Sequence, residues 1–309
     1  MKVIYDIAEF KPEKPVILTQ GTFDGVHFGH QKILRQVVDE ALQIGGVSVL
    51  LTFYPHPRLV LYPDDNELKL LSTIEEKVDL VSALGIDYLI IMPFTQELSR
   101  LRADEFVRDI LVEKLHLTKL IIGYDHRFGR NREGGMQEMV LFSETYVFEL
   151  EDIPAQDISE SIVSSTKIRQ ALLNGEVHQA GKYLGTAYVL RGKVEEGMQR
   201  GTTIGYPTAN IRVNSSYKLI PKNGVYAVWV YIDEKKFEGM LNIGYNPTFD
   251  DKKGSVEVHL SDFNQNVYHK EITVAFVSRT RDEQKFDDLQ SLINQLKEDE
   301  KEIRAILEK

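Results

Sequence analysis

Hydrophobic positions in the first 185 residues change their period several times. Residues 16–19 and 47–53 form short apolar runs with the length and β-branched content of buried strands. Between them, apolar residues over 33–42 recur at three- and four-residue intervals, which predicts an amphipathic helix. Alternating strands and helices predict a parallel sheet covered by helices. The remaining elements of this pattern are predicted helices at 75–84 and 105–115 and predicted strands at 88–92 and 120–122.

The pattern changes after Gly185. Short β-branched and aromatic segments follow one another with turn residues between them, which is typical of an antiparallel sandwich or barrel. Apolar residues over 287–309 return to helical intervals and predict one long closing helix. We therefore expect two domains, 1–185 and 186–309, joined by a helical stretch at 167–184. The predicted strands of the second domain are 188–194, 224–232, 236–243, 255–260 and 271–277.

Composition narrows the class of protein. A chain of 309 residues with 42% hydrophobic and 27% charged residues fits two globular domains. The absence of cysteine excludes disulfides, thiolate metal sites and cysteine nucleophiles. The sequence has no apolar run of 18 residues, and its first ten residues lack the apolar core of a signal peptide. The expectation is a cytoplasmic protein with no membrane partner.

The net charge of −10 is unevenly distributed. Residues 1–185 carry 19 basic and 28 acidic side chains, a net charge of −9, whereas the rest carries 18 and 19, a net charge of −1. This balance argues against a surface that coats nucleic acid. An anion site in the first half must therefore be built from local cations, and the segments 123–132 and 164–169 are locally positive.

The segment Gly21-Thr-Phe-Asp-Gly-Val-His-Phe-Gly-His30 lies between a predicted strand and a predicted helix. Ligands of open α/β sheets bind at the carboxyl ends of strands, and a helix N-terminus there offers free N–H groups to phosphate. His27 and His30 share one face at the helix entry and could stabilise charge on a phosphoryl group. An ordinary turn with two surface histidines is the alternative. His-x-Gly-His here resembles the nucleotidyltransferase superfamily, which includes class I aminoacyl-tRNA synthetases, although this chain is too short and too poor in basic residues for a synthetase.

Three other segments have both a functional and a structural interpretation. Residues 162–169 place hydroxyls and cations at a helix start, which suits phosphate binding or a plain helix cap. Residues 123–134 form a basic loop after a strand, either solvated or ligand-binding. Residues 53–57 combine aromatic side chains with a rigid proline turn, and the aromatic rings could stack on a planar ligand.

Together these motifs resemble the bacterial bifunctional FAD synthetase (riboflavin kinase/FMN adenylyltransferase) family. The resemblance runs from about Val16 to the C-terminal helix. It implies an α/β, Rossmann-like nucleotidyltransferase domain with helices on both faces of a parallel sheet, followed by an antiparallel β-barrel kinase domain with a C-terminal helix. The second half carries it in Gly192-Lys-Val-Glu-Glu-Gly197, Gly205-Tyr-Pro-Thr-Ala-Asn210, Asn242-Ile-Gly-Tyr-Asn-Pro-Thr-Phe249 and Val256-Glu-Val-His-Leu-Ser-Asp-Phe263.

The resemblance implies that the second domain converts riboflavin and ATP into FMN and ADP. A ribityl hydroxyl needs its proton removed, and by resemblance Glu257 is the base. On pattern alone, Glu257 is an ordinary glutamate on the polar face of a strand. By resemblance Thr208 and Asn210 hold Mg²⁺ and the ATP phosphates, with Gly205 and Pro207 in the same ATP-binding motif.

The first domain would join FMN and a second ATP into FAD and pyrophosphate. The FMN phosphate is already ionised, so the site needs orientation and charge compensation instead of a base. His27 and His30 are the expected catalytic residues, and the other partners are the small molecules ATP, riboflavin and FMN. The expected nucleotide-binding residues are Gly21, Phe23, Asp24, Gly25, Gly29, Ser164, Ser165, Thr166, Lys167 and Arg169, and the expected flavin-binding residues are Phe53, Pro55, Asp125, Arg127 and Phe128.

Four residues depart from the family pattern. Tyr54 stands where an acidic residue is common, His126 and Tyr206 where phenylalanine is common, and Thr202 where arginine is frequent. Two other functions stay open: an adenylyltransferase for another small phosphate ester, and a flavin-binding regulator without catalysis. The remaining histidines, His259 among them, are expected to be structural. The expected assembly state is a monomer or a weak homo-oligomer.

Overall fold

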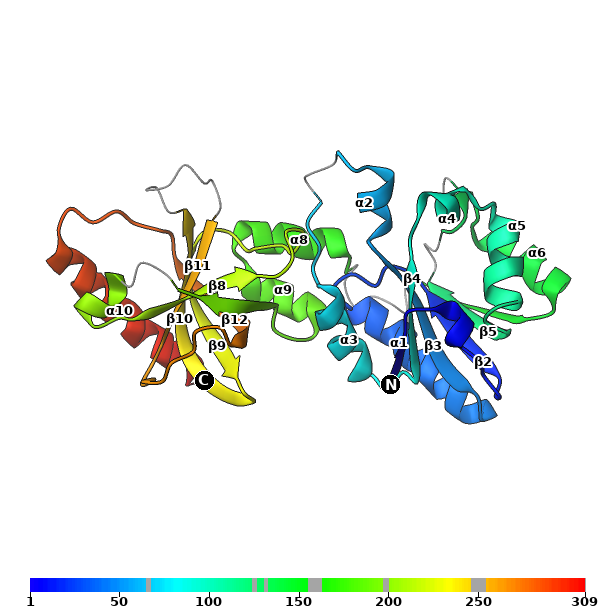
Figure 1. Cartoon of the computed structure of the whole chain (residues 1–309), viewed down its shortest axis with the longest axis horizontal. Helices are drawn as coiled ribbons and strands as arrows, with labels where there is room; N and C mark the ends of the chain where they lie inside the picture. The colour runs from blue at the N-terminus through cyan, green and yellow to red at the C-terminus, as the bar shows by residue number, and fades with distance from the viewer. Residues whose placement is uncertain are drawn as a thin grey trace. The chain divides into compact units, whose positions relative to one another are not determined.

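The computed structural model divides into two compact units, Met1–Ser165 and Thr166–Lys309 (Figure 1). The domain boundary that we predict after Gly185 follows the first two helices of the second unit. This boundary stays a prediction. Among the described residues, no helix has both the length and the apolar composition needed to cross a membrane. The structure describes residues 1–64, 68–123, 127–130, 133–154, 163–196, 200–245 and 254–308.

The first unit contains a six-stranded sheet in which all pairs are parallel. This confirms the sheet expected from alternating strands and helices. The outermost strands were not predicted, because one has only three residues and the other, with the sequence Glu-Leu-Glu-Asp-Ile, lies at an edge where charged side chains reach solvent. In spatial order the strands are β1 (Lys2–Ile4), β4 (Tyr88–Pro93), β3 (Val47–Tyr54), β2 (Val16–Gln20), β5 (Leu117–Gly123) and β6 (Glu149–Ile153).

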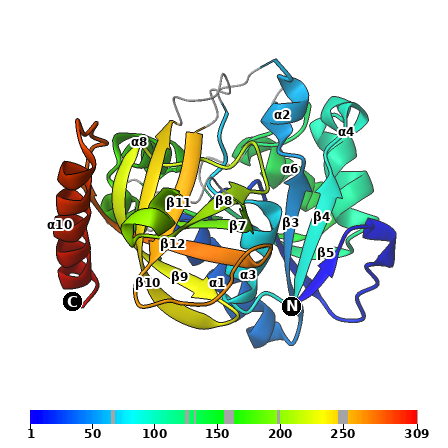
Figure 2. The ribbon, with the colours of Figure 1, turned by 60° about the vertical axis from the view of Figure 1, so that its left-hand side comes forward.

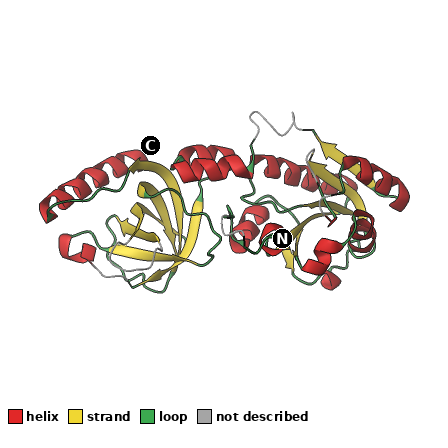
Figure 3. Cartoon of the chain, turned by 90° about the horizontal axis from the view of Figure 1, so that it is seen from above, coloured by secondary structure: helices red, strands yellow, loops and turns green. Residues whose placement is uncertain are grey.

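Successive side chains of the central strands bury opposite faces of this sheet. Ile17 and Leu50 pack in one cluster with the helices α1 (Phe28–Ile44) and α3 (Ile74–Ser82). Leu18 and Leu51 pack in the other, against the π-helix η2 (Phe106–Val112) and α6 (Met136–Tyr146). Helices therefore cover both faces, as the resemblance implied (Figure 3).

Short helices also lie in the connections between the strands of this sheet. The single helix predicted over 105–115 is a turn of α-helix that continues as the π-helix η2. Such π-helical segments are rare and are not encoded in a simple apolar period. The short helices are η1 (Ile7–Glu9), α2 (Pro57–Leu61), α4 (Gln96–Arg100) and α5 (Ala103–Glu105).

The second unit is built on a closed antiparallel barrel, which decides between the sandwich and the barrel (Figure 2). The strands follow the order β10-β11-β8-β7-β12-β9 around it. Two helices precede the barrel, α8 (Ser165–Asn174) and α9 (Val177–Leu184). The strands are β7 (Val189–Glu195), β8 (Thr208–Val213), β9 (Gly224–Ile232), β10 (Lys235–Tyr245), β11 (Gly254–Leu260) and β12 (Glu271–Arg281), with the 3-10 helix η4 (Arg200–Ile204) before β8.

The predicted closing helix is α10 (Leu289–Leu307), which lies along the outside of the barrel (Figure 2). Its Ile303 and Leu307 pack against Val225 and Met240 of the barrel. An ion pair between Arg281 of β12 and the buried Asp299 fixes the helix to the barrel, with the shorter N–O distance at 2.5 Å. Apolar contacts and one buried ion pair therefore attach this helix.

Candidate active sites

The turn after β2, residues 21–27, has an unusual backbone. Phe23 and Val26 have positive φ angles of 45° and 40°. Such angles are uncommon outside glycine, and a β-branched residue such as Val26 is a clear outlier. Both side chains are buried in the cluster beneath α1, and this burial offsets the cost of the strained turn. Packing of these two side chains therefore maintains two positive φ angles within one turn.

His27 is the N-cap residue of α1. Its Nδ1 accepts a hydrogen bond from the backbone N–H of His30 at 3.4 Å. An accepting Nδ1 carries no proton, so this contact assigns the neutral ring of His27 its proton on Nε2. The rings of His27 and His30 stack with centroids 3.6 Å apart. Both predicted catalytic histidines therefore lie together at the N-terminus of a helix.

His30 is held in its uncharged form at neutral pH. Burial lowers its pKa well below 6.5, and the neighbouring His27 and Lys77 lower the pKa further. Its Nδ1 is buried and has no hydrogen-bond partner among the described residues. The site thus presents stacked imidazoles beside the free N–H groups of a helix terminus, an arrangement suited to a phosphate group.

The turn is tied to the segment that precedes α3. The carboxylate of Asp24 accepts hydrogen bonds from the backbone N–H groups of Leu71, at 2.9 Å, and Ser72, at 3.2 Å. The N–H of Gly25 donates to Ser72 Oγ at 3.1 Å. Asp24 is buried, and its carboxylate binds the protein's own backbone. The nucleotide contact that the resemblance assigns to Asp24 stays a prediction.

The hydroxyl-rich segment 164–169 begins at this same turn. Ser165 Oγ donates to the backbone oxygen of Asp24 at 3.1 Å. Ser165 is also the first residue of α8, and Ser164 precedes it. Thr166, Lys167 and Arg169 follow on the first turns of α8, within the second unit. The structure therefore brings Ser165 to the histidine turn, and the binding roles of the other four stay predictions.

The basic loop after β5 is described only in part, because Asp125 and His126 lie outside the described residues. Arg127 is exposed, whereas Phe128 is buried in the core and pairs with Gly134 through two backbone hydrogen bonds. A Cβ at Gly134 would lie 2.7 Å from the Phe128 ring, so only glycine fits there. The predicted flavin contact of Phe128 would have to be made from this packed position.

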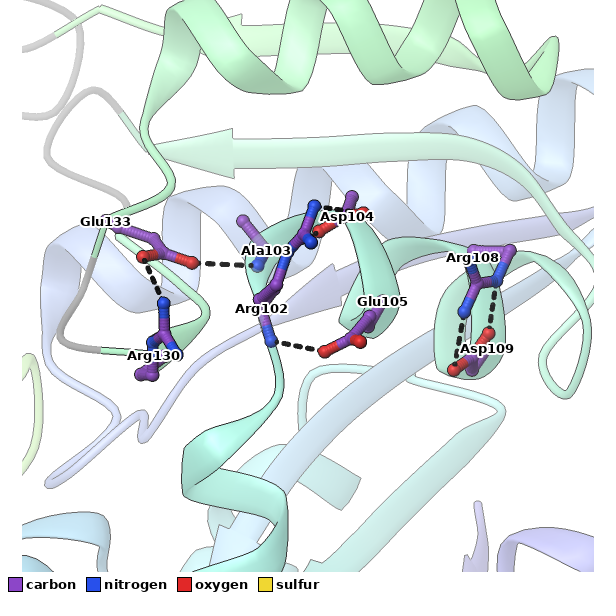
Figure 4. A network of polar contacts seen from close by, with 8 residues as sticks. All are labelled: Arg102, Ala103, Asp104, Glu105, Arg108, Asp109, Arg130 and Glu133. Carbon is purple, nitrogen blue, oxygen red and sulfur yellow. Dashed lines mark hydrogen bonds and ion pairs between the residues drawn. The ribbon is translucent and has the colours of Figure 1, made fainter.

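Figure 4 shows how the end of this loop is attached to α5. Glu133 accepts a hydrogen bond from the N–H of Ala103 at 3.3 Å and lies 3.9 Å from Arg130. The N–H of Arg130 donates to the Leu101 oxygen at 2.8 Å. The cation of Arg130 thus has a carboxylate near it at the surface, which reduces the positive charge that the loop offers to a ligand.

The aromatic turn after β3 lies at the same end of the sheet as the histidine turn. Phe53 is half-buried and packs edge-on against Phe94 at 5.7 Å. Tyr54 and Pro55 are exposed. Exposed aromatic and proline surface at the carboxyl end of a parallel strand is compatible with a planar ligand, and the flavin contact of Phe53 and Pro55 stays a prediction.

The second predicted site lies where β8 and β11 pair. Glu257 is directly opposite Asn210, and on its other side it is opposite Asn242 of β10. Thr208 Oγ1 donates to Glu257 Oε2 at 3.3 Å. Val256 and Val258 are buried on the opposite face of the strand, as alternation predicts. Thr208, Asn210 and Glu257 therefore share one patch of polar oxygens.

The approach to β8 is a tight turn. Tyr206 donates its backbone N–H to the oxygen of Gly201 at 2.9 Å, and a Cβ at Gly201 would lie 2.0 Å from the Tyr206 oxygen. Gly205 has a φ of 84°, which favours glycine. His259 Nδ1 lies 2.9 Å from the oxygen of Pro207, so this buried histidine fixes the start of β8.

In comparison with known proteins, each half of the chain matches a different family model. A family model described as FAD synthetase matches residues 9–167, and one described as riboflavin kinase matches residues 184–307. A bifunctional riboflavin kinase/FMN adenylyltransferase of Listeria monocytogenes is 39% identical over 95% of this chain and 93% of its own length. The Bacillus subtilis protein of that name is 35% identical over 93% and 90%.

The chain belongs to the bifunctional riboflavin kinase/FMN adenylyltransferase family. A solved structure from Streptococcus pneumoniae, titled a macrolide-efflux protein, matches it with a TM-score of 0.89 and 32% identity over 98% of both chains. That title names an activity of that protein only. The whole-chain match shows that both units of this family member have the same fold in a related protein.

Sequence reasoning identified the histidine turn and the Thr208–Glu257 patch of this family member but missed the supports beneath them. No sequence motif marks Leu71, Ser72 or Lys77 as part of a site. Apolar residues, serines and helical lysines occur throughout ordinary domains. The one sequence signal was the capping box between Thr73 and Glu76, which marks the start of α3.

In the second unit, Tyr206 is a departure from the family pattern. Its hydroxyl donates a hydrogen bond to Glu300 of α10 at 3.0 Å.

Proposed function

We propose that this chain phosphorylates riboflavin to FMN in its second unit and adenylylates FMN to FAD in its first unit. The observation that carries the proposal is the presence, in one chain, of the stacked His27–His30 pair at a helix N-terminus and of the Thr208–Glu257 pair across two barrel strands. Each pair suits a different nucleophile, an ionised phosphate or a neutral hydroxyl. Two successive reactions on one flavin account for both.

In the kinase step, Glu257 accepts the proton of the terminal ribityl hydroxyl as that oxygen attacks the γ-phosphorus of ATP. A new P–O bond forms, the bond to the bridging oxygen breaks, and ADP leaves. The hydrogen bond from Thr208 orients the Glu257 carboxylate. Glu257 acts here as a general base.

Thr208 and Asn210 would hold Mg²⁺ together with the ATP phosphates. A threonine hydroxyl has one proton and two lone pairs, so Thr208 can donate to Glu257 and still offer oxygen to a cation. The donor set is oxygen only, which fits a hard cation such as Mg²⁺. When bound, Mg²⁺ would neutralise phosphate charge.

In the adenylyl step, an oxygen of the FMN phosphate attacks the α-phosphorus of ATP. The bond between that phosphorus and the α,β-bridging oxygen breaks, and pyrophosphate leaves with the electron pair. The Nε2–H of His27 and the free N–H groups of α1 donate to the oxygens on which charge accumulates. Lys167 and Arg169 would add positive charge, and Phe53, Pro55 and Arg127 would contact the flavin.

The test is incubation of the purified chain with riboflavin, ATP and Mg²⁺, followed by chromatography of the flavins. The proposal requires both FMN and FAD to form, with ADP and pyrophosphate as the other products. FAD from added FMN but no FMN from riboflavin would favour a simple adenylyltransferase. Flavin binding without turnover would favour a regulator.

A further inference from the structure

Lys77 of α3 is a lysine whose ammonium lies beneath the histidine turn. The residue is 7% exposed, although lysine is almost never buried unless it is paired. Its Nζ donates to the backbone oxygen of Thr22 at 2.6 Å and to Thr52 Oγ1 at 3.4 Å. The ammonium of Lys77 therefore contacts the turn on its buried side.

The groups around Lys77 include several charges. Asp24 faces it from the turn, and His27 and His30 face the same space from the start of α1. The carboxylate of Glu76, its neighbour on α3, accepts from the N–H of Thr73 in the capping box. Burial lowers the pKa of Lys77 to about 8, and the charge of Asp24 opposes that shift. Lys77 is therefore charged at pH 7 and loses its proton at moderately alkaline pH.

We propose that Lys77 is a positioning residue for adenylyl transfer, which holds the 21–27 turn in the conformation that presents His27 and His30. This role rests on the proposed function of the first unit. The oxygen that Lys77 binds belongs to Thr22, directly before the strained Phe23. Without that bond the strained backbone can relax, and both imidazoles move with it. The ammonium also opposes protonation of His30, so it helps keep that ring uncharged.

Lys77→Met tests this role because it keeps the length of the side chain and removes the charge and the donor. We expect FAD formation from added FMN to fall about a hundredfold in kcat at pH 7, the loss associated with a displacement of about 1 Å. FMN formation by the same preparation should be unchanged, since it depends on the other unit. Lys119→Met is the matched control. Lys119 belongs to the same unit and forms ion pairs with Glu40 of α1 and Glu151 of β6. FAD formation should persist in this variant.

A pH profile separates positioning by the ammonium from a general loss of folding. FAD formation by the unmodified chain should fall several-fold as pH rises from 7 to 9, whereas Lys77→Met should show no such decline. Lys77→Arg stays charged over this range and should also lack the decline. If circular dichroism shows that Lys77→Met does not fold, Lys77→Arg is compared with the unmodified chain instead. The rate of FMN formation serves as the reference for effects of pH on ATP and Mg²⁺.

The outcomes are distinguishable. FAD formation by Lys77→Met within threefold of the unmodified chain would overturn the role of Lys77 alone. So would the same alkaline decline in Lys77→Arg. Failure of the unmodified chain to form any FAD would overturn the proposed function and the role of Lys77 together.

Discussion

Glu257 and Lys77 show how the surroundings of a charged side chain decide what it can do. Glu257 is half-buried beside hydroxyl and amide groups, where it can exchange a proton with a substrate. Lys77 is buried against a backbone oxygen and a carboxylate, where it can act only through its neighbours. The motif around Glu257 made the first residue predictable. A lysine on an amphipathic helix is normally solvated, so the second could be found only from its burial.

Glu257→Gln should abolish FMN formation and leave FAD formation from added FMN intact. The amide keeps the shape of the side chain but cannot accept the hydroxyl proton, and general base catalysis contributes about 10²- to 10⁴-fold. The measurement is the initial rate of each half-reaction on one preparation. Loss of both activities in a folded variant would contradict the assignment of one reaction to each unit.

Lys77 also gives the first unit a specific dependence of stability on pH. Its pKa is about 8 in the folded protein, against an ordinary value of 10.5. Between these values the unfolded chain binds a proton that the folded chain does not, so raising the pH from 8 to 10 favours the folded state. We expect the free energy of unfolding to rise, relative to Lys77→Met, by up to about 1.4 kcal/mol per pH unit. Denaturant titrations at pH 8, 9 and 10 measure it, and a constant difference would contradict it.

At the scale of the elements, apolar periodicity was informative wherever an element has a buried face. The central strands of the sheet, α1 and α10 were predicted because each buries a continuous apolar stripe. The edge strands β1 and β6 were not predicted, because their pairing is imposed by neighbouring strands. The helix at 105–115 was predicted, but its π-helical form, η2, was not. Closure of the second sheet into a barrel depends on pairing between distant strands, such as β8 with β11, which local pattern cannot contain.

Attachment of α10 provides a prediction at this scale. Asp299 is 1% exposed and forms two hydrogen bonds with Arg281, at 2.8 and 2.5 Å. Asp299→Ala leaves a poorly solvated guanidinium without its partner and should destabilise the second unit by about 3 kcal/mol. Glu302→Ala, on an exposed position of the same helix, should change stability by less than about 0.5 kcal/mol. Thermal unfolding of both variants measures the difference, and equal transitions would show that the ion pair does not stabilise α10.

At the scale of the whole molecule, each proposed site has its main residues within one unit. His27, His30 and Lys77 belong to Met1–Ser165, whereas Thr208 and Glu257 belong to Thr166–Lys309. The net charge of the whole chain, −10, would have been a poor guide to a protein whose proposed substrates include the anions ATP and FMN. What the sequence revealed at this scale was the change of pattern between the halves. The positive groups that matter are local, and one of them is buried.

Because the two residue sets are separate, two inactive variants should complement each other. His27→Ala with His30→Ala should lose FAD formation and keep FMN formation, whereas Glu257→Gln should do the reverse. Mixed at equal concentration with riboflavin, ATP and Mg²⁺, they should form FAD, since FMN released by one chain can diffuse to the other. Chromatography would show FMN rising first and FAD following after a lag. If each variant kept its own half-reaction but the mixture formed no FAD, FMN would have to remain with the chain that made it.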